Sequence, residues 1–366
     1  MSEPRNILHI ISRLDGYGTA RQLLHLAREQ IAEGYRLRVV ALESGRQVRA
    51  SWEKIGLPCR VLQRRWKFDP FAAWRLSDLL LQELPGVIHA WDADAVNYSA
   101  VARLRVARVP LVATFLTAPP VDHWLASQVD RLVVGSSKLS HEYAKRGVAS
   151  EKLIVAQPAI GRIPESSLSR EQMLTALKLP TDSQVIVVAG SLKRSQLVDE
   201  AIWCFELIRA LNEQVVLLIF GEGPDRERLE RFTRLVSEPA VVKFMGYRDD
   251  FRHWLSKADV FWHPGEETSI SSVVLESMAA RVPVVASDLP AHRELIENGR
   301  TGFLAPLGSR AALARHTLRL LEDPVLASEI SKAAAEEISK RFPSSAIEGA
   351  YRDLYRHLPK TAKPLE

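Results

Sequence analysis

A polar loop between two apolar runs carries the residues best placed for chemistry. Residues 258–286 read ADVFWHPGEETSISSVVLESMAARVPVVA, which predicts a strand, a loop rich in Gly, Thr and Ser, a helix, and a second buried strand. The first N–H groups of such a helix have no partner within the helix, and the helix dipole favours an anion there. The pattern therefore suits the binding of a phosphate group.

Glu276 lies about one turn into this predicted helix. Its carboxylate is placed to accept hydrogen bonds from two hydroxyl groups of a sugar that lies beside the phosphate. An ordinary Ser-capped helix in an α/β layer explains the same spacing equally well. The spacing alone leaves both interpretations open.

The length and composition are those of a soluble protein with two domains. The chain has 366 residues, of which 46% are hydrophobic and 25% charged, and its formal net charge is +5. Its basic segments, such as 60–67 and 103–108, are too short and too mixed to indicate nucleic-acid binding. A mildly basic surface suits anionic substrates or an anionic membrane surface, or has no functional meaning.

The cysteines and the apolar runs bear on the compartment. Cys59 and Cys204 are far apart and lack metal-ligand spacing, which favours a reducing compartment. The N-terminal residues show no signal-peptide pattern, and no apolar run approaches the roughly 20 residues that span a bilayer. We expect a cytoplasmic protein that is able to rest peripherally on the inner face of the membrane.

Strands and helices alternate along the first half of the chain. An apolar run at 6–11 leads to a Gly-rich turn, a helix over 20–33 and a strand at 37–42, which is typical of a doubly wound domain. We reject nicotinamide binding, because Arg21 stands where the G-x-G-x-x-G pattern requires glycine. Further strands are expected at 87–90, 111–115, 131–135 and 153–156.

Residues 158–169 contain Pro, Gly and Ser without periodicity and are predicted to link two domains. The alternation then restarts. Strands are expected at 184–189, 215–220, 241–244, 260–262 and 282–286, and the last helices at 310–321, 324–337 and 344–358. Two α/β domains in series create a cleft, which is a favoured place for a ligand.

Several segments resemble the group 1 glycosyltransferases, which are retaining enzymes of the GT-B fold. The most specific are GEGPDRERLERF at 221–232, FMGYRDDFRHWLSKADVFWHP at 244–264 and VVLESMAARVPVVASDLPAHRELIENGRTGF at 273–303. Weaker matches lie at 15–18, 85–95 and 110–115. The resemblance as a whole extends over nearly the entire chain, and these segments are its most recognisable parts.

The resemblance implies an α/β protein with two Rossmann-like parallel-sheet domains that face each other across a cleft. Residues 1–162 would form the N-terminal acceptor domain, and residues 163–343 the C-terminal domain that binds the sugar nucleotide. The last helix, 344–358, would pack back on the N-terminal domain.

The resemblance also implies roles for single residues around the donor. Glu276 would bind the ribose. The remaining contacts would be the backbone N–H groups of Ser271, Ser272 and Val273 at the diphosphate, the loop of Gly246, Tyr247 and Arg248 at the nucleobase, and the turn from Gly16 to Gly18 beside the phosphates.

Four positions depart from the family pattern. Thr268, Ser191, Gln196 and Leu116 stand where the family has Glu, Arg, Lys and His. These departures affect the contacts to the transferred sugar and to the leaving diphosphate. Removing one well-placed donor of this kind costs about 3 kcal/mol in the transition state.

Other residues are candidates to replace the missing groups. Glu267 would contact the transferred sugar if the loop shifts register, and Lys193 and Arg194 would neutralise the diphosphate from the same loop. His89 ends a strand on the expected cleft side and is preferred over His123 as a catalytic histidine.

Two further groups have a structural and a functional interpretation. Asp92 and Asp94 are expected to cap a helix, because no third ligand for a metal is evident. The aromatic residues at 66–74 could contact an acceptor or a membrane, but we expect at least half of these rings to pack in the interior.

We therefore predict a metal-independent, retaining glycosyltransferase of the hexosyltransferase type, active in cell-envelope polysaccharide synthesis. It would move a sugar from a nucleotide-sugar donor to a glycan or lipid-linked acceptor, with no cofactor and no nucleic-acid partner. The alternative is a catalytically impaired GT-B protein that binds a nucleotide sugar or acts as a scaffold. A nucleotide-sugar epimerase of the same fold has less support in the motifs.

Overall fold

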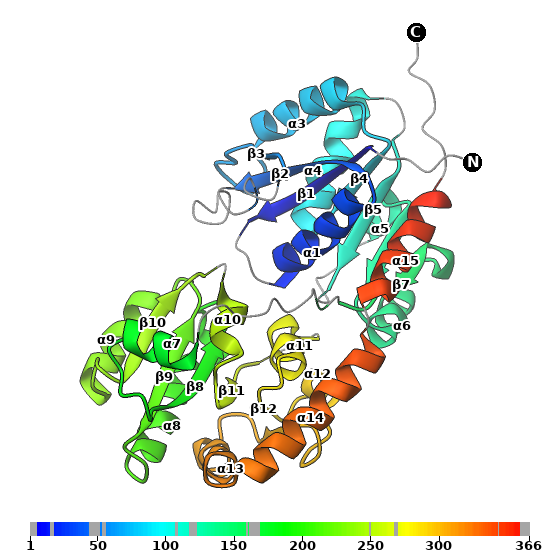
Figure 1. The fold of residues 1–366 in the computed structure, drawn as a ribbon. Coiled ribbons are helices and arrows are strands. Elements are labelled where there is room, and N and C mark those ends of the chain that lie inside the picture. The colour runs from blue at the N-terminus through cyan, green and yellow to red at the C-terminus, as the bar shows by residue number, and fades with distance from the viewer. Residues whose placement is uncertain are drawn as a thin grey trace. The chain divides into compact units, whose positions relative to one another are not determined.

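The computed structural model describes residues 6–14, 18–43, 52, 56–106, 109–116, 123–158, 160, 169–248, 250–266, 270–342 and 344–358. The chain divides into two compact units (Figure 1). Unit 1 contains Met1–Ala159 and Ser344–Glu366, and unit 2 contains Ile160–Pro343. The predicted domain boundary, between 162 and 163, lies three residues further along the chain.

Unit 1 is built on a seven-stranded parallel sheet of order β3-β2-β1-β4-β5-β6-β7. The strands are β1 Asn6–Arg13, β2 Arg36–Glu43, β3 Cys59–Val61, β4 Val87–Ala90, β5 Leu111–Phe115, β6 Arg131–Val134 and β7 Leu153–Val155. The helices are α1 Gly18–Ala32, α3 Pro70–Glu83, α4 Ala93–Ala102, α5 His123–Gln128, α6 Ser137–Lys145 and α15 Ser344–Arg356, and a short 3-10 helix, η1, spans Arg103–Arg105.

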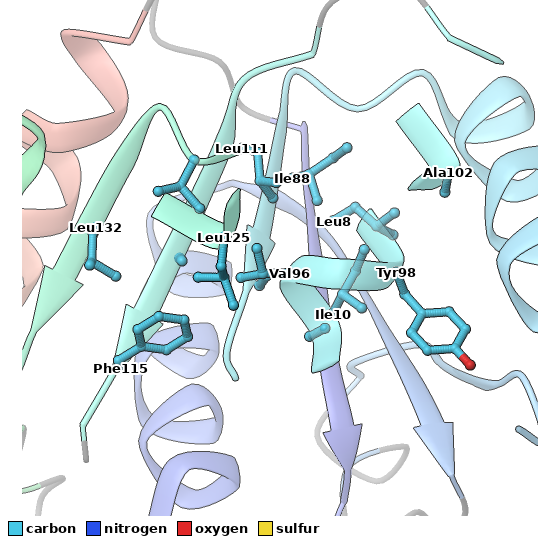
Figure 2. Close-up of a cluster of buried hydrophobic side chains, with 14 of the residues drawn as sticks. Leu8, Ile10, Ile88, Val96, Tyr98, Ala102, Leu111, Phe115, Leu125 and Leu132 are labelled. Atoms are coloured by element: carbon cyan, nitrogen blue, oxygen red, sulfur yellow. The ribbon is translucent and has the colours of Figure 1, made fainter. Parts of the chain in front are cut away.

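The two faces of this sheet are covered by different helices. Leu8 and Ile10 of β1 alternate with residues of the opposite face and pack with Ile88, Val96 and Leu111 in one apolar core (Figure 2). The helix α15 comes from the end of the chain and packs against α1 on the other face. Burial on both faces explains why these strands are apolar along most of their length.

Unit 2 is built on a six-stranded sheet of order β10-β9-β8-β11-β12-β13, again with parallel strands. The strands are β8 Gln184–Ala189, β9 Val215–Phe220, β10 Val242–Gly246, β11 Val260–His263, β12 Val284–Ser287 and β13 Phe303–Ala305. The helices are α7 Arg170–Ala176, α8 Val198–Arg209, α9 Arg226–Val236, α10 Phe251–Leu255, α11 Ser272–Ala279, α12 Pro290–Arg293, α13 Arg310–Glu322 and α14 Pro324–Arg341.

The predicted fold class is confirmed, because each unit is a parallel sheet with helices on both faces. No helix in the described ranges is both long and apolar enough to cross a bilayer.

The aromatic segment before and within α3 corrects one expectation. Trp66, Phe68, Phe71 and Trp74 are 52%, 71%, 63% and 57% exposed. The prediction that at least half of these rings pack in the interior is therefore wrong. The inward face of α3 is filled by smaller residues such as Ala72 and Leu76, which leaves the rings on the outward face.

Candidate functional site

The carboxyl ends of the unit 2 strands bring together the loops that the sequence singled out. β8 lies between β9 and β11 in the sheet. The helices that follow β8 and β11 pack on opposite faces, α8 in the apolar core around Ile186 and α11 in the core around Val185. Ligands of open α/β sheets bind where the connections diverge in this way.

Glycines allow the loops at this edge to pack backbone against backbone. A Cβ atom at Gly221 would clash with the carbonyl oxygen of Gly190, and one at Gly265 would lie 2.5 Å from the Cα atom of Gln196. The N–H group of Glu266 also donates to the carbonyl oxygen of Ser195 at 2.6 Å. The loops after β8, β9 and β11 are therefore held together as one surface.

Ser271 stands at the N-terminus of α11 but does not cap it with its side chain. Its Oγ atom lies 3.2 Å from Nε2 of His263 instead. Ser272 and Val273 form the first turn and are buried. The cap side chain accepts no hydrogen bond from the N–H groups of this turn, so the anion-binding interpretation of this helix end is retained.

His263 ends β11 and meets His292 edge to face, with 4.8 Å between the ring centroids. Burial, followed by the neighbouring His292, lowers the pKa of His263 to about 3. Burial also lowers the pKa of His292, whose Nδ1 donates to the carbonyl oxygen of Ser287 at 2.7 Å. Both rings are neutral near neutral pH and act here as hydrogen-bonding groups. The sequence analysis missed His263, although it ends an apolar strand beside the loop.

Glu276 is buried within α11 and is ion-paired. Its Oε1 atom accepts a hydrogen bond from Nη2 of Arg252 in α10 at 2.9 Å, and the Arg252 side chain is also largely buried. No pattern in the sequence pointed to Arg252, because it lies 24 residues away on a different helix.

Lys193 and Arg194 lie in the loop that leaves β8, where they were predicted to neutralise a diphosphate. Both side chains are exposed. Neither forms an ion pair or a side-chain hydrogen bond with any other described residue. Within the described ranges, they are therefore two positive charges without an ion-pair partner at the carboxyl edge of the sheet.

Gly246, Tyr247 and Arg248 follow β10 at the same edge. Gly246 has a φ of +65°, a conformation that favours glycine, and a Cβ atom there would lie 2.8 Å from Oε1 of Glu222. Arg248 donates two hydrogen bonds to the carboxylate of Asp250, at 2.7 and 2.8 Å, and lies over the ring of Trp254. Its charge is therefore already engaged.

Some predicted residues lie outside the described part of the chain. Glu267, Thr268 and Gly16 are among them, and the side chain of His123 is not described either. Gly18 is described and begins α1 with a φ of +44°.

The other departures from the family pattern occupy ordinary structural positions. Gln196 donates weakly from Nε2 to the carbonyl oxygen of Glu266 at 3.4 Å. Ser191 is half-buried in the same loop. In unit 1, Leu116 packs next to Gly135.

His89 lies inside unit 1, within a closed network of hydrogen bonds. Its Nδ1 lies 2.7 Å from the hydroxyl of Tyr355, and its Nε2 lies 2.7 Å from Oγ1 of Thr114. The ring stacks on Trp91 and is fully buried. Because both ring nitrogens are engaged within the unit, this geometry favours a structural role for His89 in the attachment of α15.

Asp92 caps α4, as the sequence indicated. Its carboxylate accepts hydrogen bonds from the N–H groups of Ala95 at 2.8 Å and Ser12 at 2.7 Å. Asp94 pairs with Arg64 at 2.5 Å.

A separate hollow of about 560 Å³ on unit 2 is lined by α12, the turn at 297–302 and α14. Its arginines are already paired: Arg293 with Asp288, and Arg300 with Glu297. We therefore place the candidate site at the carboxyl edge, where the uncommitted cations lie.

Comparisons with known proteins agree with this architecture. A family model described as "Glycosyl transferases group 1" matches residues 183–323, and one described as "Glycosyltransferase Family 4" matches residues 17–160. The two matches fall on unit 2 and on unit 1.

Curated relatives extend over almost the entire chain. A lipopolysaccharide core biosynthesis glycosyltransferase of Rhizobium meliloti is 25% identical and aligns over 95% of this chain and 97% of its own length. A phosphatidyl-myo-inositol mannosyltransferase of Mycobacterium leprae is 28% identical and aligns over 92% of each chain.

Solved structures share the fold at low identity. The Anabaena protein HepE, crystallised in complex with UDP-glucose, matches with a TM-score of 0.81 at 19% identity, over 96% of this chain and 100% of its own. A sucrose-phosphate synthase of Thermosynechococcus elongatus matches with a TM-score of 0.75 at 18% identity, over 96% of this chain and 98% of its own.

Proposed function

Because this chain belongs to the group 1 glycosyltransferases of the GT-B fold, we propose that it moves a sugar from a nucleotide-sugar donor to a glycan or lipid-linked acceptor. The transfer retains the configuration of the anomeric carbon and needs no metal. Unit 2 binds the donor and unit 1 the acceptor. The enzyme works in the cytoplasm, in peripheral contact with the membrane.

The proposal rests mainly on one observation. The N-terminus of α11, with Glu276 about one turn in, lies in the same unit and at the same sheet edge as the uncommitted cations Lys193 and Arg194. Anion-binding N–H groups, a carboxylate and two positive charges are the groups that a nucleoside diphosphate requires.

We assign each group a part in donor binding. Glu276 accepts hydrogen bonds from the ribose hydroxyls, while Arg252 holds its Oε1 atom. The N–H groups of Ser271, Ser272 and Val273 contact the diphosphate. The remaining contacts, at the nucleobase, the phosphates and the transferred sugar, are proposed for Gly246, Tyr247, Arg248, Gly16, Gly18 and Glu267.

Transfer of the sugar depends most on the two cations Lys193 and Arg194. The bond between the anomeric carbon and the diphosphate oxygen breaks, and a bond to the acceptor oxygen forms on the same face of the sugar. The acceptor proton leaves with the diphosphate. Lys193 and Arg194 stabilise the charge that develops on the leaving group, in place of the arginine and lysine that Ser191 and Gln196 replace.

Release of nucleoside diphosphate from a panel of nucleotide sugars, with and without acceptor extracts, tests the proposal. Removing both cations in Lys193→Ala/Arg194→Ala is expected to lower kcat by about 100-fold or more, because each well-placed donor contributes about 3 kcal/mol. Arg234→Ala removes an exposed cation from α9 and should leave kcat unchanged.

The alternative function is a nucleotide-sugar binding or scaffold module. The replacements at four positions of the family pattern favour it, namely Thr268, Ser191, Gln196 and Leu116. Nucleotide binding in calorimetry that is lost in Glu276→Ala, together with no turnover of any donor, would support this alternative and contradict transferase activity.

A further inference from the structure

The exposed rings of Trp66, Phe68, Phe71 and Trp74 form a cluster that we call the aromatic patch. It lies on the loop after β3 and on the first turns of α3, at the β3 edge of unit 1 (Figure 1). None of the groups in the proposed reaction lies in this segment.

Buried polar groups fix the loop that carries the aromatic patch. Asp69 is buried, and its carboxylate accepts hydrogen bonds from the N–H groups of Arg65 at 3.0 Å, Phe71 at 3.0 Å and Ala72 at 3.2 Å. The Tyr98 hydroxyl accepts from the N–H of Asp69 at 2.7 Å and donates to the carbonyl of Lys67 at 3.2 Å. The rings are therefore presented to solvent by a well-fixed backbone.

The apolar surface continues along the outward face of α3. Leu81 is exposed and falls on the same helix face as Phe71 and Trp74, at a helical spacing. Leu104 of the adjacent 3-10 helix is also exposed, and an ion pair of 3.1 Å between Arg105 and Asp78 joins that helix to α3. Exposed apolar side chains gathered on one helix face in this way are typical of an interaction site.

The charges on this surface are positive. The exposed side chains of Arg65 and Lys67 flank the rings, and the Lys67 ammonium lies 5.8 Å from the centroid of the Phe68 ring. Every acidic residue in 62–84 is engaged, since Asp69 caps α3, Asp78 pairs with Arg105, and Glu83 pairs with Arg38.

We propose that the aromatic patch docks unit 1 on a membrane surface that contains anionic lipids. Indole rings and basic side chains next to exposed apolar groups favour the headgroup layer. The Trp74 indole N–H has no partner among the described residues and is available to a headgroup. The proposed function includes peripheral contact with a membrane, and the aromatic patch would supply the surface for that contact. In that respect the inference rests on the proposed function.

Two other occupants fit the surface less well. A second copy of the chain, paired patch to patch about a two-fold axis, would bring two copies of Arg65 and Lys67 into one interface. A glycan would stack on the rings but would find no uncommitted carboxylate between residues 62 and 84 to accept its hydroxyl hydrogen bonds.

Cosedimentation of the full chain with vesicles tests the proposal. Binding is expected to vesicles of phosphatidylcholine with added phosphatidylglycerol, to weaken with salt, and to be weaker on phosphatidylcholine alone. Phe71→Ser/Trp74→Ser should reduce binding by about tenfold or more. Arg65→Gln/Lys67→Gln should reduce binding to anionic vesicles by about fivefold for each cation removed.

Trp124→Ser is the matched control, since it removes a 48% exposed tryptophan from α5 of the same unit, and it should bind vesicles as the unaltered protein does. Circular dichroism checks that each variant is folded. The proposal is overturned if the unaltered protein binds neither type of vesicle, or if Phe71→Ser/Trp74→Ser binds vesicles as well as the unaltered protein. It is also overturned if sedimentation velocity shows that the patch instead mediates self-association.

Turnover of a nucleotide sugar with a water-soluble acceptor, in the absence of vesicles, separates this inference from the proposed function. The patch variants should keep that turnover. A protein that binds vesicles through the patch but turns over no donor would contradict only the proposed function.

Discussion

At the scale of single residues, the burial of Glu276 determines what it needs from its neighbours. A buried carboxylate without a partner is costly, and Arg252 offsets that cost with a hydrogen bond of 2.9 Å. Arg252 is therefore a positioning residue, because it fixes the carboxylate that we propose as the ribose ligand.

Breaking this pair should affect stability and nucleotide binding together. Glu276→Gln replaces the carboxylate that pairs with the buried Arg252 guanidinium at 2.9 Å by a neutral amide, and should cost about 3–5 kcal/mol in urea unfolding. Arg252→Met/Glu276→Gln should cost less than Glu276→Gln alone, because it removes both charges. Both variants should bind a nucleoside diphosphate at least about tenfold more weakly in calorimetry, since the loss of a hydrogen bond to a charged group is worth about 1.5–3 kcal/mol.

The exposed pair of Arg293 and Asp288 provides a matched control. Arg293→Gln should change stability by less than about 1 kcal/mol, because exposed ion pairs contribute little. Equal effects in the buried and exposed pairs would contradict the positioning role of Arg252.

Buried histidines make the stability of the protein dependent on pH. Burial lowers the pKa of His9 to about 4, and burial with the nearby His292 lowers that of His263 to about 3. The unfolded chain takes up protons on these rings below its own pKa of 6.5, whereas the folded chain does not. Stability therefore falls as the pH drops from 6.5 towards the folded values.

We expect each of these two histidines to remove about 2 kcal/mol of stability between about pH 7 and pH 5. His9→Gln and His263→Gln should flatten the dependence of the urea midpoint on pH, whatever their effect at neutral pH. A midpoint that does not respond to pH in this range would refute the burial argument.

At the scale of elements, the close packing of the loops after β8 and β9 depends on glycine. Gly221 has a φ of +142°, and a side chain there meets the backbone of Gly190 rather than a flexible neighbour. The backbone must therefore move before a side chain fits.

Gly221→Ala should destabilise the protein by roughly 3 kcal/mol or more in urea unfolding and weaken nucleotide binding. Gly349→Ala is the control, because it lies in α15 with nothing within 4 Å of the added Cβ atom. That substitution should leave stability unchanged or raise it by up to about 1 kcal/mol. Similar stabilities for both variants would show that the loops adjust freely.

At the scale of the whole molecule, the end of the chain completes the first unit. α15 contributes Tyr351 and Tyr355, which are buried against His89 and Thr114 of the unit 1 sheet. Among the described residues, the apolar cores of unit 2 are formed by that unit's own strands and helices.

Deletion of residues 344–366 should therefore damage unit 1 selectively. His89 and Thr114 lose their hydrogen-bond partners Tyr355 and Tyr351, and α1 loses a packing partner. Hydrogen exchange read by mass spectrometry should show faster exchange in the unit 1 strands and unchanged protection in β8 and β9. The milder Tyr355→Phe should also speed hydrogen exchange in the unit 1 strands, and should lower the stability of that unit by about 1–3 kcal/mol. Equal loss of protection in both units would contradict this assignment.

The fold class could be predicted from the amino-acid sequence alone, and so could the helix end at which we propose the donor site. The alternation of apolar strands and amphipathic helices predicted two parallel sheets, and the helix start at Ser271 with Glu276 about one turn later predicted the helix end. These features depend on residues close together in the chain, whose spacing reflects which side of a strand or helix is buried.

The partners that cover each buried side became known only from the folded chain. It paired Glu276 with Arg252 on another helix, joined His89 to Tyr355 across 266 positions, and left the rings of Trp66 and Phe68 in solvent. Periodicity cannot supply these facts, because it marks a face as apolar or polar without naming the partner. That partner is set by the order of the strands in the sheet and by the course of the chain between them.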